Sequence, residues 1–323
     1  MFKYIIKRII SLIPVALIIS VLLFGLSKAM PGDPIRSMIP DSIKDPVQIQ
    51  EAYDKLRAEF GYDRPIPVQY VRWAGRLLQG DLGMSTQFKR PVALVIQEPL
   101  KNSIILNLFS ITLSFLIAIP VGIKSAVKRG SKFDNFWQVF TLVGLSVPTF
   151  FIAMILIFTF AIKLQILPIG SMPSVGNGGI GYILRYGKHL ILPVATLTIG
   201  SLASTTRYVR NAMVEVLNQD YIRTARSKGL STKVVIYRHA FRNALIPIVT
   251  LIAGSLVAVF GGSMITESIF AWNGIGYILQ QAIINKDYNI VLAMNMFYAV
   301  IALLANLLMD LGYALVDPRV KLD

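Results

Sequence analysis

The chain has 323 residues, of which 54% are hydrophobic and 15% charged, and its mean hydropathy is +0.62. It contains no cysteine, which excludes disulfides, thiolate metal sites and cysteine catalysis. A net charge of +15 would suit a nucleic-acid-binding protein, but in so apolar a chain lysine and arginine more simply anchor cytoplasmic loops. The composition indicates an integral membrane protein whose partner is the lipid bilayer and no nucleic acid.

Six stretches of the chain carry no charged residue at all. An α-helix rises about 1.5 Å per residue, so crossing a hydrocarbon core of about 30 Å takes about 20 residues. Five stretches reach or nearly reach that length, and the fourth does so with its flanks. We therefore expect an all-α protein with six membrane-spanning helices. The stretches are Ile9–Ser27, Ser103–Ile123, Phe136–Ile162, Leu190–Thr206, Asn243–Thr266 and Tyr288–Met309.

The basic residues are distributed unevenly between the connections. Residues 207–242 carry eight lysines and arginines against two acids, whereas residues 267–287 carry one lysine against two acids. Lysine and arginine gather in cytoplasmic loops, so we expect both termini in the cytoplasm. The first stretch has 19 residues and exceeds the 7–15 residues usual for the apolar part of a cleaved signal peptide. We expect it to be retained as a membrane anchor.

The long first connection, predicted to be external, contains a helix with clear start and stop signals. Asp45 fits an N-cap and Pro46 the first helical position. Apolar residues then recur at helical spacing as far as Phe60, and Gly61 fits the position just after the helix end.

A second amphipathic helix is expected from Pro67 to a stop at Gly80. Its apolar stripe consists of Val68, Val71, Ala74 and Leu78. We expect this stripe to pack mainly on the protein's own core, while the polar face could serve as a landing platform for an external partner.

The most informative polar segment lies between the fourth and fifth stretches. The run from Asp220 to Lys228 has no helix breaker, Gly229 suits a left-handed position at the helix end, and Ser231 suits the N-cap of a further helix. This segment is therefore predicted to form a helix, a sharp turn and a helix on the cytoplasmic side. Anchoring the loop would require its charges but not a glycine corner.

The run YIRTARSKGLSTKVVIYRHAFRNALIP resembles the cytoplasmic loop of binding-protein-dependent ABC importer permeases. The variant is that of the oligopeptide, dipeptide and nickel family. Of the general importer pattern, only Ala225 and Gly229 match outright. Other matching segments are MPGDP at 30–34, FGYDRPIPVQYVRWAGRLLQGDLGMS at 60–85, ESIFAWNGIGYILQQAI at 267–283 and DLGYALVDPR at 310–319.

This resemblance implies a permease core in residues 102–323, with a coupling loop at about 213–243, preceded by a first span and an extracytoplasmic helical region in residues 1–101. It also implies three kinds of protein partner: a second homologous permease subunit, two cytoplasmic ATPase subunits and an extracytoplasmic solute-binding protein. The chain would be a transport subunit rather than an enzyme and would bind no cofactor, with ATP and Mg on the ATPases. The location implied is the cytoplasmic membrane of a bacterium or archaeon.

The function implied is half of a translocation path for oligopeptides or dipeptides delivered by the binding protein. Nickel, metal chelates or other small solutes are the alternative cargo. The alternative of another class is an ion-coupled secondary transporter. It would need ionisable groups near the bilayer centre, and the six uncharged stretches disfavour it.

The candidate site residues lie mostly at the glycine corner, where the resemblance implies contact with an ATPase. They are Arg223, Thr224, Ala225, Arg226, Lys228, Gly229, Leu230 and Ser231. Two acids have possible gating or structural roles. Asp310 falls within the last apolar segment, and Glu267 follows the fifth stretch, where simple solvation is the alternative. No metal site is expected, because His189 and His239 lack both ligand spacing and acidic partners.

Overall fold

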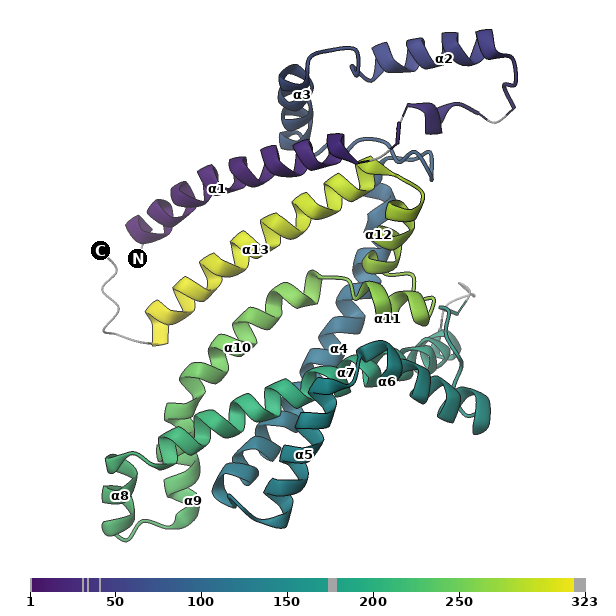
Figure 1. The fold of residues 1–323 in the computed structure, drawn as a ribbon. Helices are drawn as coiled ribbons and strands as arrows, with labels where there is room; N and C mark the ends of the chain where they lie inside the picture. Colours follow the sequence, from purple (N-terminus) through teal and green to yellow (C-terminus); the bar gives the residue numbers. More distant parts are fainter. Residues whose placement is uncertain (1, 31, 34, 41, 174–178, 317–323) are drawn as a thin grey trace. The chain divides into compact units, whose positions relative to one another are not determined.

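The computed structural model describes residues 2–30, 32–33, 35–40, 42–173 and 179–316. Over this part of the chain the regular secondary structure is helical, apart from an isolated antiparallel bridge between Met84 and Pro91 (Figure 1). The chain divides into two compact units. The first is built from Met1–Lys101 and Ile278–Leu307, and the second from Asn102–Tyr277 and Leu308–Leu322.

Within the described residues, four helices are long and apolar enough to cross a membrane, or up to six if each of two bent helix pairs counts as one span. The prediction of six spans thus corresponds to the higher count. As expected, the flanks of the fourth stretch lengthen its helix enough to cross. The four helices are α1 (Phe2–Ala29), α4 (Val92–Val127), α7 (Ile180–Leu217) and α13 (Tyr288–Val316).

The third predicted span is not one straight helix. It consists of α5 (Lys132–Ser146) and α6 (Thr149–Leu156), and α6 continues as the π-helical η2 (Ile157–Lys163). The second half is bent by 104° from the direction of the first. Pro148 explains the break, because a proline disfavours helical geometry in the residue before it, and Val147 is indeed extended.

The fifth predicted span is also bent, and it ends earlier than expected. The pair 232–245 and 247–260 is bent by 52°, at a proline that cannot donate a helical hydrogen bond. The helix α10 (Arg242–Phe260) stops where Gly261 turns extended. Two short helices follow, α11 (Met264–Ile269) and α12 (Ile275–Ile284).

The helices predicted in the first long connection are confirmed. After a 3-10 turn, η1 (Arg36–Met38), α2 spans Pro46–Glu59, and the Asp45 side chain accepts a hydrogen bond from the Val47 N–H. The helix α3 spans Ile66–Leu78.

The apolar stripe of α3 does not pack on the protein's own core, contrary to the prediction. In the first unit, Val71 is 66% exposed and Leu78 is 90% exposed. Instead, a neighbouring face of α3 packs against α1. The Tyr70 hydroxyl lies 2.8 Å from Ser20 Oγ of α1, and the centre of the Trp73 ring lies 5.4 Å from that of Phe24. Large aromatic rings bury more surface than valine, which explains why they face α1.

A buried carboxylate holds the loop before α4 against the start of α13 within the first unit. Asp287 is fully buried and accepts hydrogen bonds from the Ser85 hydroxyl and the Gln87 N–H. It also accepts from the Ile290 N–H, so it caps the first turn of α13, where a negative charge is favourable. Asn289 adds a bond to the Met84 carbonyl.

Single cysteines test the predicted orientation. Cysteine at Gln50 or Gln281 should react with a membrane-impermeant maleimide added to intact cells. Cysteine at Ser131 or Ser231 should react only after the cells are opened. Gln50 and Ser231 are both exposed in the structure. A difference in labelling between these two positions would therefore not arise from burial within the protein. Labelling of position 231 from outside would contradict the orientation.

Candidate functional site

The segment 220–241 forms the predicted corner between two helices. The helix α8 spans Asp220–Ser227, and α9 (Thr232–Val234) runs directly into the π-helical η3 (Val235–Phe241). Gly229 has a φ of +72° and follows Lys228, the C-cap of α8, which is the left-handed position predicted for it. Ser231 is the N-cap of α9 and accepts a bond through its carbonyl from the Val235 N–H, rather than through its side chain.

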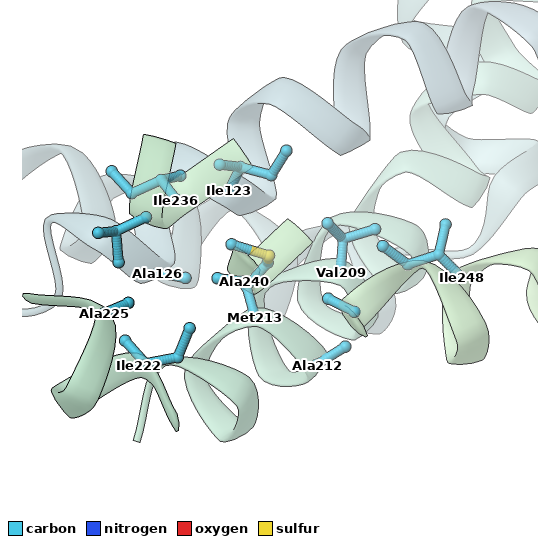
Figure 2. Packing of buried hydrophobic residues seen from close by; sticks show 12 residues of the cluster. Ile123, Ala126, Val209, Ala212, Met213, Ile222, Ala225, Ile236, Ala240 and Ile248 are labelled. Carbon is cyan, nitrogen blue, oxygen red and sulfur yellow. The ribbon is translucent and has the colours of Figure 1, made fainter. Parts of the chain in front are cut away.

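An apolar cluster fixes this corner to the rest of the second unit. Figure 2 shows Ile222 and Ala225 of α8 in the same cluster as Met213 and Ile236. The cluster draws on α4, α7, α8, η3 and α10, so five elements hold the corner in place. Its buried members are Ile123, Ala126, Val209, Ala212, Met213, Ile222, Ala225, Val235, Ile236, Ala240, Ala244 and Ile248.

Seven of the eight residues predicted to contact a partner are exposed, namely Arg223, Thr224, Arg226, Lys228, Gly229, Leu230 and Ser231. Ala225 is the exception. Its side chain is buried in the protein's own core, so it cannot form part of an outer contact surface. Ala225 stands out in the family pattern, whereas nothing in that pattern points to Ile222, which is buried beside it. Their spacing of three residues puts both on one helix face and could have indicated an inward role.

The exposed face of the corner is basic. Arg223 lies 3.4 Å from Asp220, but both side chains are largely exposed, so this pair contributes little stability. In the described part of the chain, no ion pair joins Arg226, Lys228 or Lys233 to an acid. The corner therefore presents positive charge together with the partly exposed Leu230.

A buried ion pair supports the same end of the second unit and was missed from the sequence. Asp134, at the start of α5, is fully buried and receives two bonds from Arg210 of α7, at 2.6 and 2.8 Å. The Gly130 N–H and the Gln138 amide also donate to Asp134. This pair ties the turn between α4 and α5 to α7. Asp134 is a lone acid that follows four basic residues closely. Its isolation among them is the sequence feature that could have indicated a buried ion pair.

Glu267 is fully buried, so the alternative of simple solvation is wrong. Its Oε1 accepts from the Ser103 hydroxyl at 2.7 Å and from the Ser263 N–H at 3.2 Å, and its Oε2 accepts from the Tyr277 N–H at 3.0 Å. A side chain at Gly274 would overlap this carboxyl group. Glu267 thus clamps the segment from Ser263 to Tyr277 onto α4.

The clamp has a testable dependence on pH. Burial raises the pKa of the Glu267 carboxyl, and the bonds from Ser103 and from the backbone oppose that rise. The folded chain therefore holds this proton more tightly than the unfolded chain does. The resulting stability is fully present below a pH of about 4.5, the ordinary pKa, and is lost as pH rises through the folded pKa.

Replacing Glu267 by glutamine should lower the free energy of unfolding by about 1–3 kcal/mol, because an amide N–H would face groups that donate. The loss relative to the native chain should be largest at acid pH and should shrink toward neutral pH. Thermal midpoints in detergent from pH 5 to 8 would measure it. Glu98→Gln, at an exposed position on α4, is the control and should change little. A loss independent of pH would contradict the raised pKa.

Asp310 lies on α13, and its side chain is outside the part of the chain whose side chains the structure describes. Its possible gating or structural role therefore stays a prediction.

Comparison with known proteins supports the family resemblance over the whole chain. The model of the family described as "Binding-protein-dependent transport system inner membrane component" matches residues 118–322. The corresponding N-terminal family model matches residues 1–116.

Two curated relatives match over nearly their full lengths. The oligopeptide transport system permease protein AppB of Bacillus subtilis is 38% identical over 322 residues, covering 99% of this chain and 100% of the relative. A putative peptide permease protein of Brucella suis is 36% identical over 323 residues, covering 99% of both.

A solved structure has a related fold. One chain of the MetNI methionine ABC transporter, in an inward-facing conformation, matches with a TM-score of 0.50 and 18% identity. The match covers 69% of this chain and 97% of that one, and at this identity it speaks for the fold alone. The family matches, the relatives and the apolar helices agree: the chain belongs to the family of inner membrane components of binding-protein-dependent transport systems.

Proposed function

We propose that the chain is a permease subunit of an ABC importer and forms half of a translocation path for peptides. The observation that carries this proposal is the similarity to peptide permeases of 36–38% identity, which runs through both the N-terminal region and the core. Nickel and metal chelates remain the alternative cargo; among the described residues no cluster of histidine and acidic side chains favours them.

In this proposal the basic corner around Gly229 docks into a groove on a cytoplasmic ATPase. The positive charge of Arg226 and Lys228 suits acidic groups on that partner, and Leu230 offers an apolar contact. Because interiors are close-packed, a displacement of the corner passes through the cluster beneath it to α7 and α10. ATP binding and hydrolysis would then take place on the ATPases, and this chain would convert their closure into movement of its spans.

The remaining partners follow from the same proposal. An external binding protein delivers the solute to the side that carries α2 and α3, and a second homologous permease completes the path. Both termini lie in the cytoplasm. Alternating access at the interface of the two permeases then moves the solute inward.

Uptake in cells tests this function and separates its alternatives. Deleting the gene should abolish uptake of a labelled oligopeptide, and expression of this chain should restore it. Nickel uptake serves as the control and should not change. Collapsing the ion gradients while ATP is maintained should leave peptide uptake intact. Loss of nickel uptake alone on gene deletion would favour the alternative cargo. Loss of peptide uptake when the ion gradients are collapsed would favour ion coupling.

A further inference from the structure

The first unit contains a cleft whose charged side chains are mainly basic. Its volume is about 640 Å³, and the end of α1, the corner between α2 and α3 and the start of α13 line it. Four cationic side chains line the cleft, against two acids, Asp33 and Glu59. The cations are Lys28, Arg57, Arg72 and Arg76.

In the described part of the chain no salt bridge joins any of the four cations to an acid. Arg57 has a longer-range electrostatic interaction with Asp33. Both oxygens of Asp33 are engaged elsewhere, by the Tyr53 hydroxyl at 2.6 Å and the Ile35 N–H at 2.9 Å. Lys28 is half-buried, and its Nζ lies 3.7 Å from the centre of the Tyr62 ring. A partly desolvated cation without an anion is costly, so the cleft is suited to an anionic ligand.

The surroundings of the cleft show which kind of anion fits. Lys28 is at the end of the membrane-spanning part of α1. Val21 and Leu17 lie seven and eleven residues before it, on the same helix face, and both are exposed. On α3, the stripe with Val71 and Leu78 is exposed as well. A cationic cleft at the end of an exposed apolar helix face matches an amphiphile, with its anionic head in the cleft and its chains along α1.

We propose that this cleft binds the phosphate headgroup of an anionic phospholipid, with Arg72 and Arg76 on the phosphate and Lys28 at the level where the acyl chains begin. A soluble phosphate would use the cations but not the apolar face of α1. Lipid in the cleft would also bring the exposed stripe of α3 to the membrane surface, where amphipathic helices are stable.

Binding of short-chain phosphatidylglycerol to the purified full-length chain, in the complex that it forms, tests the proposal. Native mass spectrometry or a titration in detergent would give the affinity, with phosphatidylcholine as the neutral comparison. Phosphatidylglycerol should bind at least tenfold more tightly. The double variant Arg72→Gln and Arg76→Gln should bind it about 25-fold more weakly, since each cation near a membrane surface is worth roughly fivefold.

Two further variants separate the cleft from general charge and from folding. Gly75→Leu should fill the cleft without changing charge, and it should fold, because no atom lies within 4 Å of the added Cβ. It should also weaken lipid binding. The control Lys55→Gln with Arg64→Gln removes two cations outside the cleft and should leave the affinity unchanged. Thermal midpoints would check folding.

Three results would overturn the proposal. Unchanged lipid affinity in both cleft variants would show that the lipid binds elsewhere. Equal competition by glycerol 3-phosphate would identify a site for soluble anions. Cleft variants that keep the lipid but lose association with the external binding protein would make the cleft a protein-docking site.

Discussion

Replacing Gly229 with valine should reduce ATP-driven uptake at least tenfold while the membrane complex still assembles. Gly229 has a φ of +72°, and no atom lies within 4 Å of the position that a Cβ would occupy. The penalty is therefore a backbone penalty, about 1–2 kcal/mol for a residue with a side chain, and larger for a β-branched one. The corner would relieve it by opening, which moves Leu230 and Ser231 out of register with the partner.

The measurement is uptake and ATP hydrolysis in the same membrane vesicles. Hydrolysis should continue or become independent of the binding protein, whereas uptake should fail. Gly80→Val is a matched control, because Gly80 also has a positive φ, of +81°, with free space around it, but lies in the first unit. It should leave uptake within twofold of the native level. Normal transport by the Gly229→Val complex would refute the coupling role of the corner.

Removing one partner of the Asp134–Arg210 pair should lower the free energy of unfolding by about 3–5 kcal/mol. Asp134→Ala would leave the guanidinium of Arg210, which is only 15% exposed, without its anion. It would also leave the N–H of Gly130 without an acceptor. The turn between α4 and α5 should detach from α7, and the yield of folded protein should fall with it.

A double variant distinguishes the effect of an unpaired buried charge from the effect of lost packing. Asp134→Ala with Arg210→Met removes both charges and should recover part of the loss, because replacing a buried pair by apolar groups is often tolerated. Asp220→Ala is the control, since it breaks the exposed contact with Arg223 and should cost less than 1 kcal/mol. Thermal and denaturant unfolding in detergent would measure all three. A double variant no more stable than Asp134→Ala would contradict the explanation by an unpaired buried charge.

Features set by neighbouring residues could be predicted from the sequence. The cap at Asp45 and the left-handed turn at Gly229 depend on a few adjacent residues, and both are confirmed. The spans follow from length and apolarity, which are also local quantities. The bend at Pro148 had a local signal, but its size, 104°, depends on what the two halves pack against.

Features set by distant residues could not be predicted. Arg210 is 76 residues from Asp134, and Ser103 is 164 residues from Glu267, so nothing in either local pattern indicates its partner. The same limit applies to helix faces. The sequence of α3 offers two apolar faces, and only the position of α1 decides that Tyr70 and Trp73 are the ones that pack.

The bond between Ser85 and Asp287 has a consequence for biosynthesis. The two residues are 202 positions apart, yet they hold together one compact unit. Ribosomes add about 5–20 residues per second, so the loop that carries Ser85 waits roughly 10–40 s before Asp287 has been made. During that interval the Ser85 hydroxyl and the Gln87 N–H lack the carboxylate that they contact in the folded unit. A nascent chain truncated before residue 287 would never form these contacts.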